Sequence, residues 1–248
     1  MTTTFRDKVR KVLGLREAAK ALTHLQVILI TGSSSGIGLA TTLALLAAGA
    51  KVFGIDISDA PPALASSPSY RHHKADLLDR SVPNLAVTAC LAHFGPRIDA
   101  LLNVAGISDG FGGVHTLRDE DWDRVMAINA TAPTLLMRAV VPIMQAQGGG
   151  SIVNVTSTAS YNGGVAGVAY TASKHCLLGV TKQTAWRYKK DNIRVNAVAP
   201  GPTATNIGTS IAQGSIDLDG MQASKPVLTS HGVNMESGDG IMEASKVC

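Results

Sequence analysis

The sequence predicts an α/β protein in which helices flank a doubly wound parallel sheet. Short apolar runs rich in Val, Ile and Leu alternate with helical segments, the pattern that predicts a parallel sheet. Aromatic residues make up only 4% of the 248 residues while glycine occurs 25 times, so aliphatic side chains and close backbone approaches have to build the core. A chain of this length buries one sizeable core, and we expect a single domain.

Composition argues against several classes of function. The net charge of +4 is modest and the basic residues are spread out beyond the N-terminus, which disfavours nucleic-acid binding. Cys90, Cys176 and Cys248 are too far apart for a disulfide framework or a zinc site, so we expect no metal and a reducing, cytoplasmic location. No run approaches the roughly 18 to 20 apolar residues of a membrane span, and we expect a soluble protein.

Residues 1–25 are predicted to be a basic N-terminal extension. Lysines and arginines alternate there with apolar residues, which is typical of a basic amphipathic helix. A transit peptide, a membrane-surface helix, and a helix packed on the domain or frayed from it all stay open. Asp7, Glu17 and the absence of serine from residues 1–24 disfavour the transit peptide, so a simple N-terminal helix is the preferred interpretation.

The first strand leads into a glycine-rich turn. The apolar run 27–30 is followed by Thr31-Gly32-Ser33-Ser34-Ser35-Gly36-Ile37-Gly38 and then by a helix over 39–48. Glycines let a pyrophosphate approach the backbone, and the helix N-terminus offers free N–H groups, so this order predicts a Rossmann-like dinucleotide site rather than a merely structural turn. The expected contacts are Gly32, Ser34, Gly36, Ile37 and Gly38.

Asp56 ends the second strand, 51–55, about twenty residues beyond the glycines. An acidic group there can accept hydrogen bonds from ribose hydroxyls and would repel a 2′-phosphate, so NAD is favoured over NADP. The alternative is an aspartate that only caps the next turn, near Ser58 and Asp59.

The remaining elements follow the same alternation. His72 and His73 fall on a short strand over 70–74, where neighbours point to opposite faces and would rarely share a metal. Pro133 is expected to kink the long helix that carries Asn129. The other elements are expected to be a helix over 82–94, strands over 98–106, 151–156 and 193–198, the long helix over 122–144, and a helix that carries Tyr170.

Tyr170 and Lys174 are four residues apart, so on a helix they share one face. A lysine ammonium beside a tyrosine favours the phenolate, and together they can exchange a proton with a substrate oxygen near neutral pH. Such a pair also arises by chance on helix surfaces, and the other motifs decide between the two interpretations.

Together these residues resemble the short-chain dehydrogenase/reductase family from about residue 26 to about 206. Val104 stands where the family has a second asparagine, a mild departure that leaves the neighbouring Asn103 and small residues in place. The resemblance is carried by Thr31-Gly32-x-x-x-Gly36-x-Gly38, Asp76-Leu77, Asn103-Val104-Ala105-Gly106, Asn129, Ser157, Tyr170-x-x-x-Lys174, and Pro200-Gly201 leading to Thr205.

The resemblance implies a role for each matching residue. Tyr170 would be the general acid/base, and Lys174 would support its phenolate and bind the nicotinamide ribose. Ser157 would hold the substrate oxygen, and Asn129 would anchor a water on the proton route. The implied cofactor contacts also include Asp76 and Leu77 at the adenine, Asn103, Ala105 and Gly106 on the adenosine side, and Pro200, Gly201, Thr203 and Thr205 near the nicotinamide.

Beyond a Rossmann domain over 26–205, the expected pattern breaks off. Residues 206–240 are Gly/Ser-rich and are expected to form a mobile segment over the substrate, and 240–248 resemble the start of the family's next helix. The rest of that helix and the last sheet strand are missing from the pattern, so we expect 206–248 to be a truncated substrate-covering segment. Because the missing elements usually form a subunit interface in the family, whether the chain forms a homo-oligomer stays an open question. The candidate apolar contacts are Met221, Val227, Leu228 and Met235.

The implied function is an oxidoreductase that transfers a hydride between NAD(H) and a secondary alcohol or ketone. Loops 107–116 and 158–168 are small and mostly uncharged, which indicates a small apolar or weakly polar substrate. Two alternatives stay open: a protein that binds the cofactor without turnover because its C-terminus is truncated, and a non-redox lyase or isomerase on the same fold.

Overall fold

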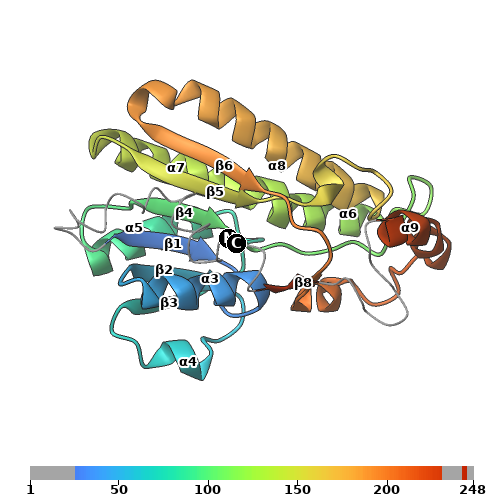
Figure 1. Cartoon of the computed structure of the whole chain (residues 1–248), viewed down its shortest axis with the longest axis horizontal. Helices are drawn as coiled ribbons and strands as arrows, with labels where there is room; N and C mark the ends of the chain where they lie inside the picture. Colours follow the sequence, from blue (N-terminus) through green and yellow to red (C-terminus); the bar gives the residue numbers. More distant parts are fainter. Residues whose placement is uncertain (1–25, 231–241, 245–248) are drawn as a thin grey trace, which may run out of the picture.

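The computed structural model describes residues 26–230 and 242–244. Its main sheet has six parallel strands, and Figure 1 shows this sheet sandwiched between helices. The strand order β3-β2-β1-β4-β5-β6 confirms the predicted doubly wound sheet. The strands are β1 (Val27–Thr31), β2 (Lys51–Asp56), β3 (Tyr70–Lys74), β4 (Ala100–Asn103), β5 (Gly150–Val155) and β6 (Ile193–Val198). The main helices are α3 (Gly36–Ala47), α4 (Pro62–Ala65), α5 (Val82–Phe94), α6 (Asp119–Met126), α7 (Ala132–Ala146), α8 (Val168–Arg187) and α9 (Leu218–Ser230).

Strand β1 lies in the middle of the sheet, and every one of its residues is buried. Ile28 pairs with Val52 of β2 on one side and with Ala100 of β4 on the other. A strand covered on both faces needs a continuous apolar sequence instead of an alternating one, and Val-Ile-Leu-Ile meets that need.

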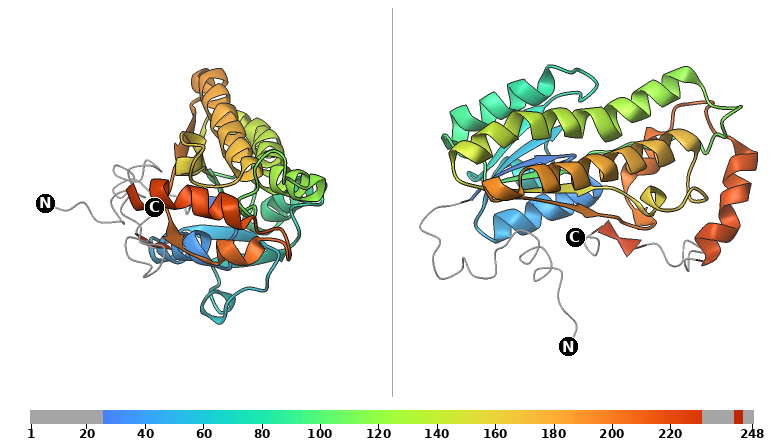
Figure 2. Two further views of the ribbon diagram at one scale, coloured as in Figure 1. Left: turned by 90° about the vertical axis from the view of Figure 1, so that its right-hand side faces the viewer. Right: turned by 90° about the horizontal axis from the view of Figure 1, so that it is seen from above.

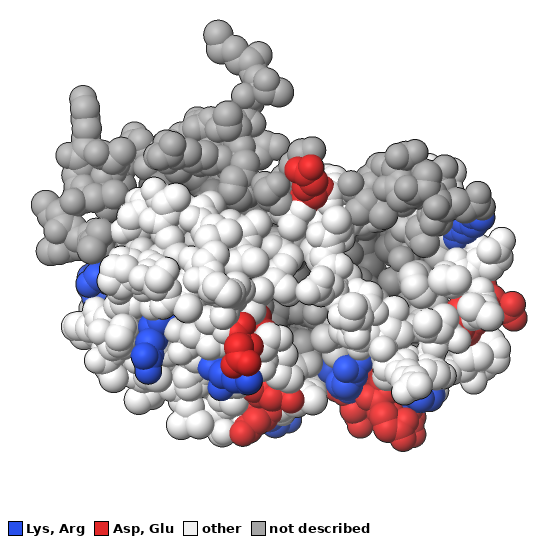
Figure 3. Space-filling model, turned by 90° about the horizontal axis from the view of Figure 1, so that it is seen from below, with Lys and Arg blue, Asp and Glu red and all other residues white. Residues whose placement is uncertain are grey.

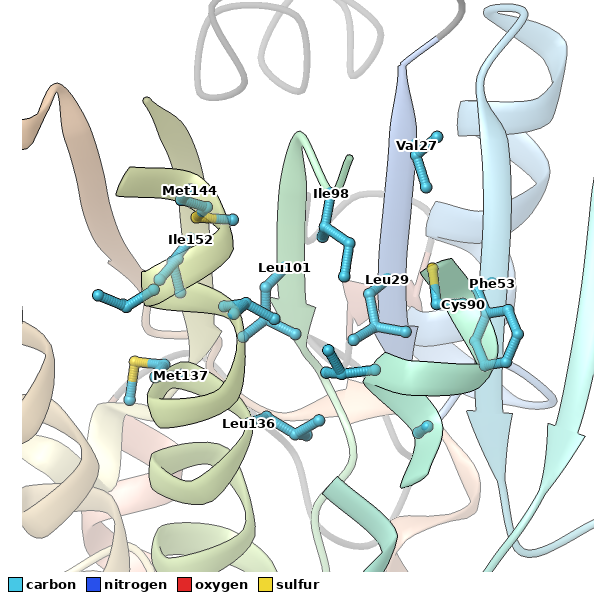
Figure 4. Close-up of a cluster of buried hydrophobic side chains, with 14 of the residues drawn as sticks. Val27, Leu29, Phe53, Cys90, Ile98, Leu101, Leu136, Met137, Met144 and Ile152 are labelled. Carbon is cyan, nitrogen blue, oxygen red and sulfur yellow. The ribbon is translucent and has the colours of Figure 1, made fainter. Parts of the chain in front are cut away.

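Alternate residues of β1 enter two separate hydrophobic cores. Val27 and Leu29 face the layer that contains α5 and α7, whereas Ile28 and Ile30 face α3. Figure 2 shows α7 and α8 running side by side along one face of the sheet. Figure 4 shows the first core, with labelled side chains Val27, Leu29, Phe53, Cys90, Ile98, Leu101, Leu136, Met137, Met144 and Ile152.

The predicted long helix contains a π-helical turn. Helices α6 and α7 are joined by a π-helical segment, Ala127–Thr131, in which the Ala132 N–H donates to the Ala127 carbonyl. Pro133 lies in the first turn of α7, so the irregularity comes just before the proline instead of at it. Pro133 has no N–H for the Asn129 carbonyl, which favours a wider turn at this point.

This continuous helix, Asp119–Ala146, has the length and composition of a membrane span, with 56% of its most apolar window buried inside the fold. A core helix accounts for the same length and composition. It is the single helix of this kind in the part of the chain that the structure describes.

The sheet opens between the carboxyl ends of β1 and β4, because the chain crosses to opposite faces from these two strands. The Thr31 hydroxyl accepts hydrogen bonds from the backbone N–H groups of Val104 and Ala105, each at 3.0 Å. These two bonds set the spacing of the strand ends at the point where ligands bind in such sheets.

The segment after residue 205 is more ordered than its composition suggests. It contains a 3-10 helix, Asn206–Ser210, and α9, which lies beyond the carboxyl ends of the strands in Figure 1. The prediction that a helix starts near 240 is wrong for Met242 and Glu243, which form strand β8. This strand pairs with β7 (Thr203–Ala204), and the Met242 N–H donates to the Pro202 carbonyl. Residues 1–25, Met235 and the rest of 240–248 lie outside the described residues.

Candidate functional site

A cavity of about 1090 Å³ lies at the carboxyl ends of the strands and extends from the glycine-rich turn to α8. Among the predicted catalytic and cofactor-binding residues, Asn103 and Asn129 do not line it. Of the expected apolar substrate contacts, Leu228 lines it, whereas Met221 and Val227 do not. The predicted residues that do line it are Gly32, Ser34, Gly36, Ile37, Gly38, Asp56, Asp76, Leu77, Ala105, Gly106, Ser157, Tyr170, Lys174, Pro200, Gly201, Thr203 and Thr205.

The glycine-rich turn is folded so tightly that side chains are excluded. Gly32 has φ +69°, and a Cβ atom at Gly38 would lie 1.9 Å from the Gly32 carbonyl oxygen. The chain therefore passes directly from β1 into α3, and the first N–H groups of α3 are presented at the cavity.

The N-terminus of α3 fits an anionic group. Its N-cap, Ser35, makes no side-chain cap, and the first turn holds no acidic residue. The buried Ser34 hydroxyl lines the cavity and has no hydrogen-bond partner among the described residues. Free N–H groups, the positive end of the helix dipole and an unpaired hydroxyl together suit a phosphate, so these residues fit the pyrophosphate of a dinucleotide.

Asp56 joins the turn to the loop after β2. One carboxylate oxygen accepts from the Ser34 N–H and the other from the Ser58 N–H, each at 2.9 Å. The turn-capping alternative is thus present in the structure, and Asp56 still lines the cavity. Asp59 and Asp76 also line this end, which is acidic, although Asp59 is paired with Lys74.

Three predicted catalytic residues meet at the opposite end. Ser157 follows β5, and its hydroxyl lies close enough to Tyr170 of α8 to lower the pKa of that phenol. The Lys174 ammonium nitrogen lies 5.5 Å from the centre of the Tyr170 ring and donates to the Val155 carbonyl at 3.0 Å. One helical turn separates Tyr170 from Lys174, which is why both reach the same wall of the cavity.

Burial sets the ionisation of this group. It raises the pKa of Tyr170 above 10.0, the Ser157 hydrogen bond opposes that rise, and the charge of Asp109 adds to it. Burial also lowers the pKa of Lys174 from 10.5 to about 8. The sequence predicted a phenolate favoured by its lysine, whereas in the structure desolvation favours the protonated phenol of Tyr170, which is the form that can donate a proton.

Asn129 is fully buried and its amide is used for structure. It accepts from the Ile107 N–H and donates to the Ile107 carbonyl, both at 2.9 Å, and it also donates to Ser173 at 3.1 Å. A Cβ atom at Gly106 would lie 3.4 Å from both the Asn129 oxygen and the Lys174 nitrogen. Asn129 therefore fixes the chain that follows β4 next to the lysine.

Asn103 lies in a buried polar network beneath the cavity. Its amide nitrogen donates to Asn154 on β5, and Asn154 in turn donates to Thr181 on α8, both at 2.8 Å. The side chain therefore ties adjacent strands to α8 instead of reaching the adenosine end, where the resemblance had placed it.

Sequence reasoning missed two polar residues near the site. Arg124 of α6 lines the cavity and donates to the carbonyl of Ser210, holding the 3-10 helix against the opening. Asp109 is buried in the loop after β4 and accepts from the Tyr170 N–H at 2.9 Å. Both partners are backbone groups distant in sequence, and no local motif marks such contacts.

The described residues contain no group of three His, Cys, Asp or Glu side chains that could hold a metal ion. His72 contacts Tyr70 and the Ser58 carbonyl, whereas His73 stacks beside Phe53. On the face seen in Figure 3, acidic and basic side chains are intermixed, without a continuous basic region.

Comparisons with known sequences agree with this site. The profile of the short chain dehydrogenase family matches residues 26–215. The short-chain dehydrogenase/reductase cdmF of Talaromyces verruculosus is 51% identical over 212 residues, covering 86% of this chain and 83% of the relative. The short-chain dehydrogenase/reductase olcF of Penicillium canescens is 49% identical over 203 residues, covering 82% of this chain and 79% of the relative.

Solved structures show the same arrangement of elements. Levodione reductase superposes with a TM-score of 0.74 at 30% identity, covering 89% of this chain and 86% of its own. A 3-ketoacyl-(acyl-carrier-protein) reductase from Brucella melitensis, complexed with NADH, superposes with a TM-score of 0.75 at 25% identity and the same coverage. With the sheet order, the glycine-rich turn and the Ser157, Tyr170 and Lys174 group, these matches establish that the chain belongs to the short-chain dehydrogenase/reductase family of oxidoreductases.

Proposed function

We propose that this protein transfers a hydride between NAD(H) and the carbon of a secondary alcohol or ketone. The observation that carries the proposal is the single cavity that joins an anion-binding helix N-terminus to a buried tyrosine, serine and lysine. A nicotinamide bound between these two ends would supply or accept the hydride, and the protein's residues handle the proton.

In the reducing direction, Tyr170 donates its phenolic proton to the substrate oxygen. Its raised pKa suits that task, because a protonated phenol is the dominant form before reaction. The Ser157 hydroxyl, which lies beside Tyr170 at the cavity wall, holds and polarises the same oxygen. In the oxidising direction the roles reverse, and the tyrosine oxygen accepts the alcohol proton.

Lys174 stabilises the phenolate that remains after the proton has been donated. A pKa of about 8 leaves the lysine largely charged at neutral pH while letting it exchange a proton easily. Asn129 contributes through its backbone, since Pro133 removes the N–H that an α-helix would direct at the Asn129 carbonyl. That carbonyl lacks its α-helical donor, so we propose that it holds a water through which the proton route continues beyond Lys174.

NAD(H) is the cofactor that the charges favour. Asp56, Asp59 and Asp76 gather at the turn end of the cavity, and a 2′-phosphate there would meet like charge. The cationic residues among the lining are Arg124 and Lys174, and neither lies in the loop after β2. The NADH described for the Brucella melitensis reductase is consistent with this preference.

The substrate end of the cavity favours a small apolar or weakly polar molecule. Phe111, Ile128, Val165 and Leu228 line it from four different elements. For carbonyl reduction in such a pocket, the substrate oxygen has to bind next to Ser157 and Tyr170, while the rest of the substrate contacts apolar side chains.

The test is a panel of ketones and secondary alcohols assayed by nicotinamide absorbance with the wild type and Tyr170→Phe. Phenylalanine keeps the ring and removes the proton, so we expect turnover to fall by about 10²- to 10⁴-fold while NADH still binds. A variant that turns over at the wild-type rate would refute the acid/base role. Wild-type protein that binds NADH but reduces no member of the panel would refute hydride transfer to this substrate class.

A further inference from the structure

Asp109 is a buried carboxylate that belongs to none of the sequence motifs described above. Its side chain lies in the loop after β4, and the residue is only 5% exposed. One carboxylate oxygen accepts from the Gly167 N–H at 3.1 Å and from the Phe111 N–H at 3.3 Å. The other accepts from the Tyr170 N–H at 2.9 Å.

These contacts make Asp109 the N-terminal cap of the catalytic helix. Gly167 is the N-cap residue of α8 and has no side chain with which to cap it. A Cβ atom at Gly167 would lie 2.5 Å from a carboxylate oxygen of Asp109, so only glycine leaves space for this distant carboxylate. The helix dipole and the N–H groups compensate the charge, since no Lys or Arg of the described residues pairs with Asp109.

The same carboxylate also holds part of the cavity wall. Phe111 lines the cavity and has φ +66°, a left-handed conformation that is unfavourable for a phenylalanine. Its N–H is directed at Asp109, and the neighbouring Gly110 carbonyl accepts from the Asp217 N–H at 2.7 Å. The loop is thus held on one side by the catalytic helix and on the other by the segment that leads into α9.

We propose that Asp109 is a positioning residue that holds the backbone of Tyr170 and the Phe111 wall in one fixed geometry. The proposal rests on the proposed function, because it takes Tyr170 as the acid/base. A displacement of about 1 Å in a reacting group can lower a rate about 10²-fold, so the loss of this anchor acts on turnover. Cofactor affinity is largely unaffected, because Asp109 does not line the cavity.

The charge of Asp109 gives the proposal a signature that a purely structural role would lack. That charge raises the pKa of Tyr170, so its neutralisation lets the phenolate form at lower pH. Around Tyr170, the charged or polar groups of the packed elements are Lys174 on α8, Arg124 on α6, Asn129 in the π-helical turn, Ser157 after β5, and Asp109.

The experiment compares Asp109→Asn, Asp109→Ala and the control Asp121→Asn. Asp121 is also a buried carboxylate in the first turn of a helix, α6, but it pairs with Arg118 and does not line the cavity. Turnover, the KM for NADH, the thermal midpoint and the ultraviolet titration of the Tyr170 phenolate are measured for each. Tyr170→Phe serves as the spectroscopic blank.

For Asp109→Asn we expect kcat to fall about 10- to 100-fold, the KM for NADH to stay within about twofold, and the phenolate to appear at lower pH. Asparagine keeps the volume and one acceptor, so this variant carries the test even where Asp109→Ala does not fold. An unchanged phenolate titration, or equal changes in Asp121→Asn, would overturn the proposal. If the wild type turns over no substrate, the proposed function fails. The titration of the Tyr170 phenolate then still shows whether Asp109 acts on Tyr170.

Discussion

Replacing Lys174 with methionine should remove the activity of the protein. It should also change the free energy of unfolding, relative to the wild type, more favourably near neutral pH than at alkaline pH. Lys174 is 3% exposed, and its nitrogen makes one hydrogen bond, to the Val155 carbonyl. Methionine has a similar length and carries no charge, so the substitution removes the buried ammonium with little change in packing.

The magnitude follows from the pKa of the lysine. A decrease from 10.5 to about 8 means that burying the charged form costs about 3 kcal/mol, at about 1.4 kcal/mol per pKa unit. Below pH about 8 the lysine is charged in both the folded and the unfolded protein, and the full cost is present. As the pH rises the folded form loses its proton first, so the cost falls to below about 1 kcal/mol near pH 10 and vanishes above about 10.5.

The free energy of unfolding is therefore measured by urea denaturation at about pH 7 and about pH 10 for the wild type and Lys174→Met. The unpaired Val155 carbonyl lowers the stability of the variant by about 1 to 3 kcal/mol at both values, so it cancels in the comparison. Between about pH 7 and about pH 10, we expect the free energy of unfolding of the wild type to rise by about 2 kcal/mol relative to that of Lys174→Met.

Lys182→Met is the matched control, because Lys182 lies exposed on the same helix and should change stability by less than about 0.5 kcal/mol at both pH values. A stability difference for Lys174→Met that does not depend on pH would refute the reasoning, since the ammonium would then cost nothing to bury. Retained turnover would refute the catalytic role of the lysine.

Two further substitutions test the cofactor end. Asp56→Ala should raise kcat/KM with NADPH relative to NADH, because it removes the charge that faces a 2′-phosphate; an unchanged ratio in paired assays would contradict this. Gly38→Ala should weaken NADH binding at least about 10-fold in fluorescence titrations, because its methyl group would lie 1.9 Å from the Gly32 carbonyl and force the turn open. Gly179→Ala, with open space around the added Cβ, is the control that should bind normally, and tight binding by Gly38→Ala would show that the turn tolerates the change.

Features that depend on residues close together in the chain were the most predictable. The glycine-rich turn and the pair Tyr170 and Lys174 depend on spacing along one strand, turn or helix, and the cavity is lined by Gly32, by residues 34–38 and by this pair. Asp56 also lies at the end of its strand, as its distance from the glycines indicated. Strand and helix periodicity fixes where such side chains point, whatever the rest of the chain does.

Contacts that depend on long-range packing could not be predicted from the sequence. Asn103 and Asn129 follow the expected chain order, but their side chains bond Asn154 and Ile107 and do not themselves line the cavity. The π-helical turn, the pairing of Met242 with the Pro202 carbonyl and the direction of the Tyr170 pKa shift were not foreseen either. Each depends on desolvation or on a partner that the sequence does not identify.

The sequence alone was enough to predict the parallel sheet and the glycine-rich turn, because both follow from local periodicity and spacing. It also identified Tyr170 and Lys174 by their spacing, and Ser157 through the family resemblance, as the proposed acid/base group. The folded chain added that Asp109 caps the helix of Tyr170 across 61 residues of chain, and that burial raises the pKa of Tyr170. Hydrogen-bond partners and solvent exclusion are properties of the packed molecule, so distant segments acquire them only when the sheet brings their ends together.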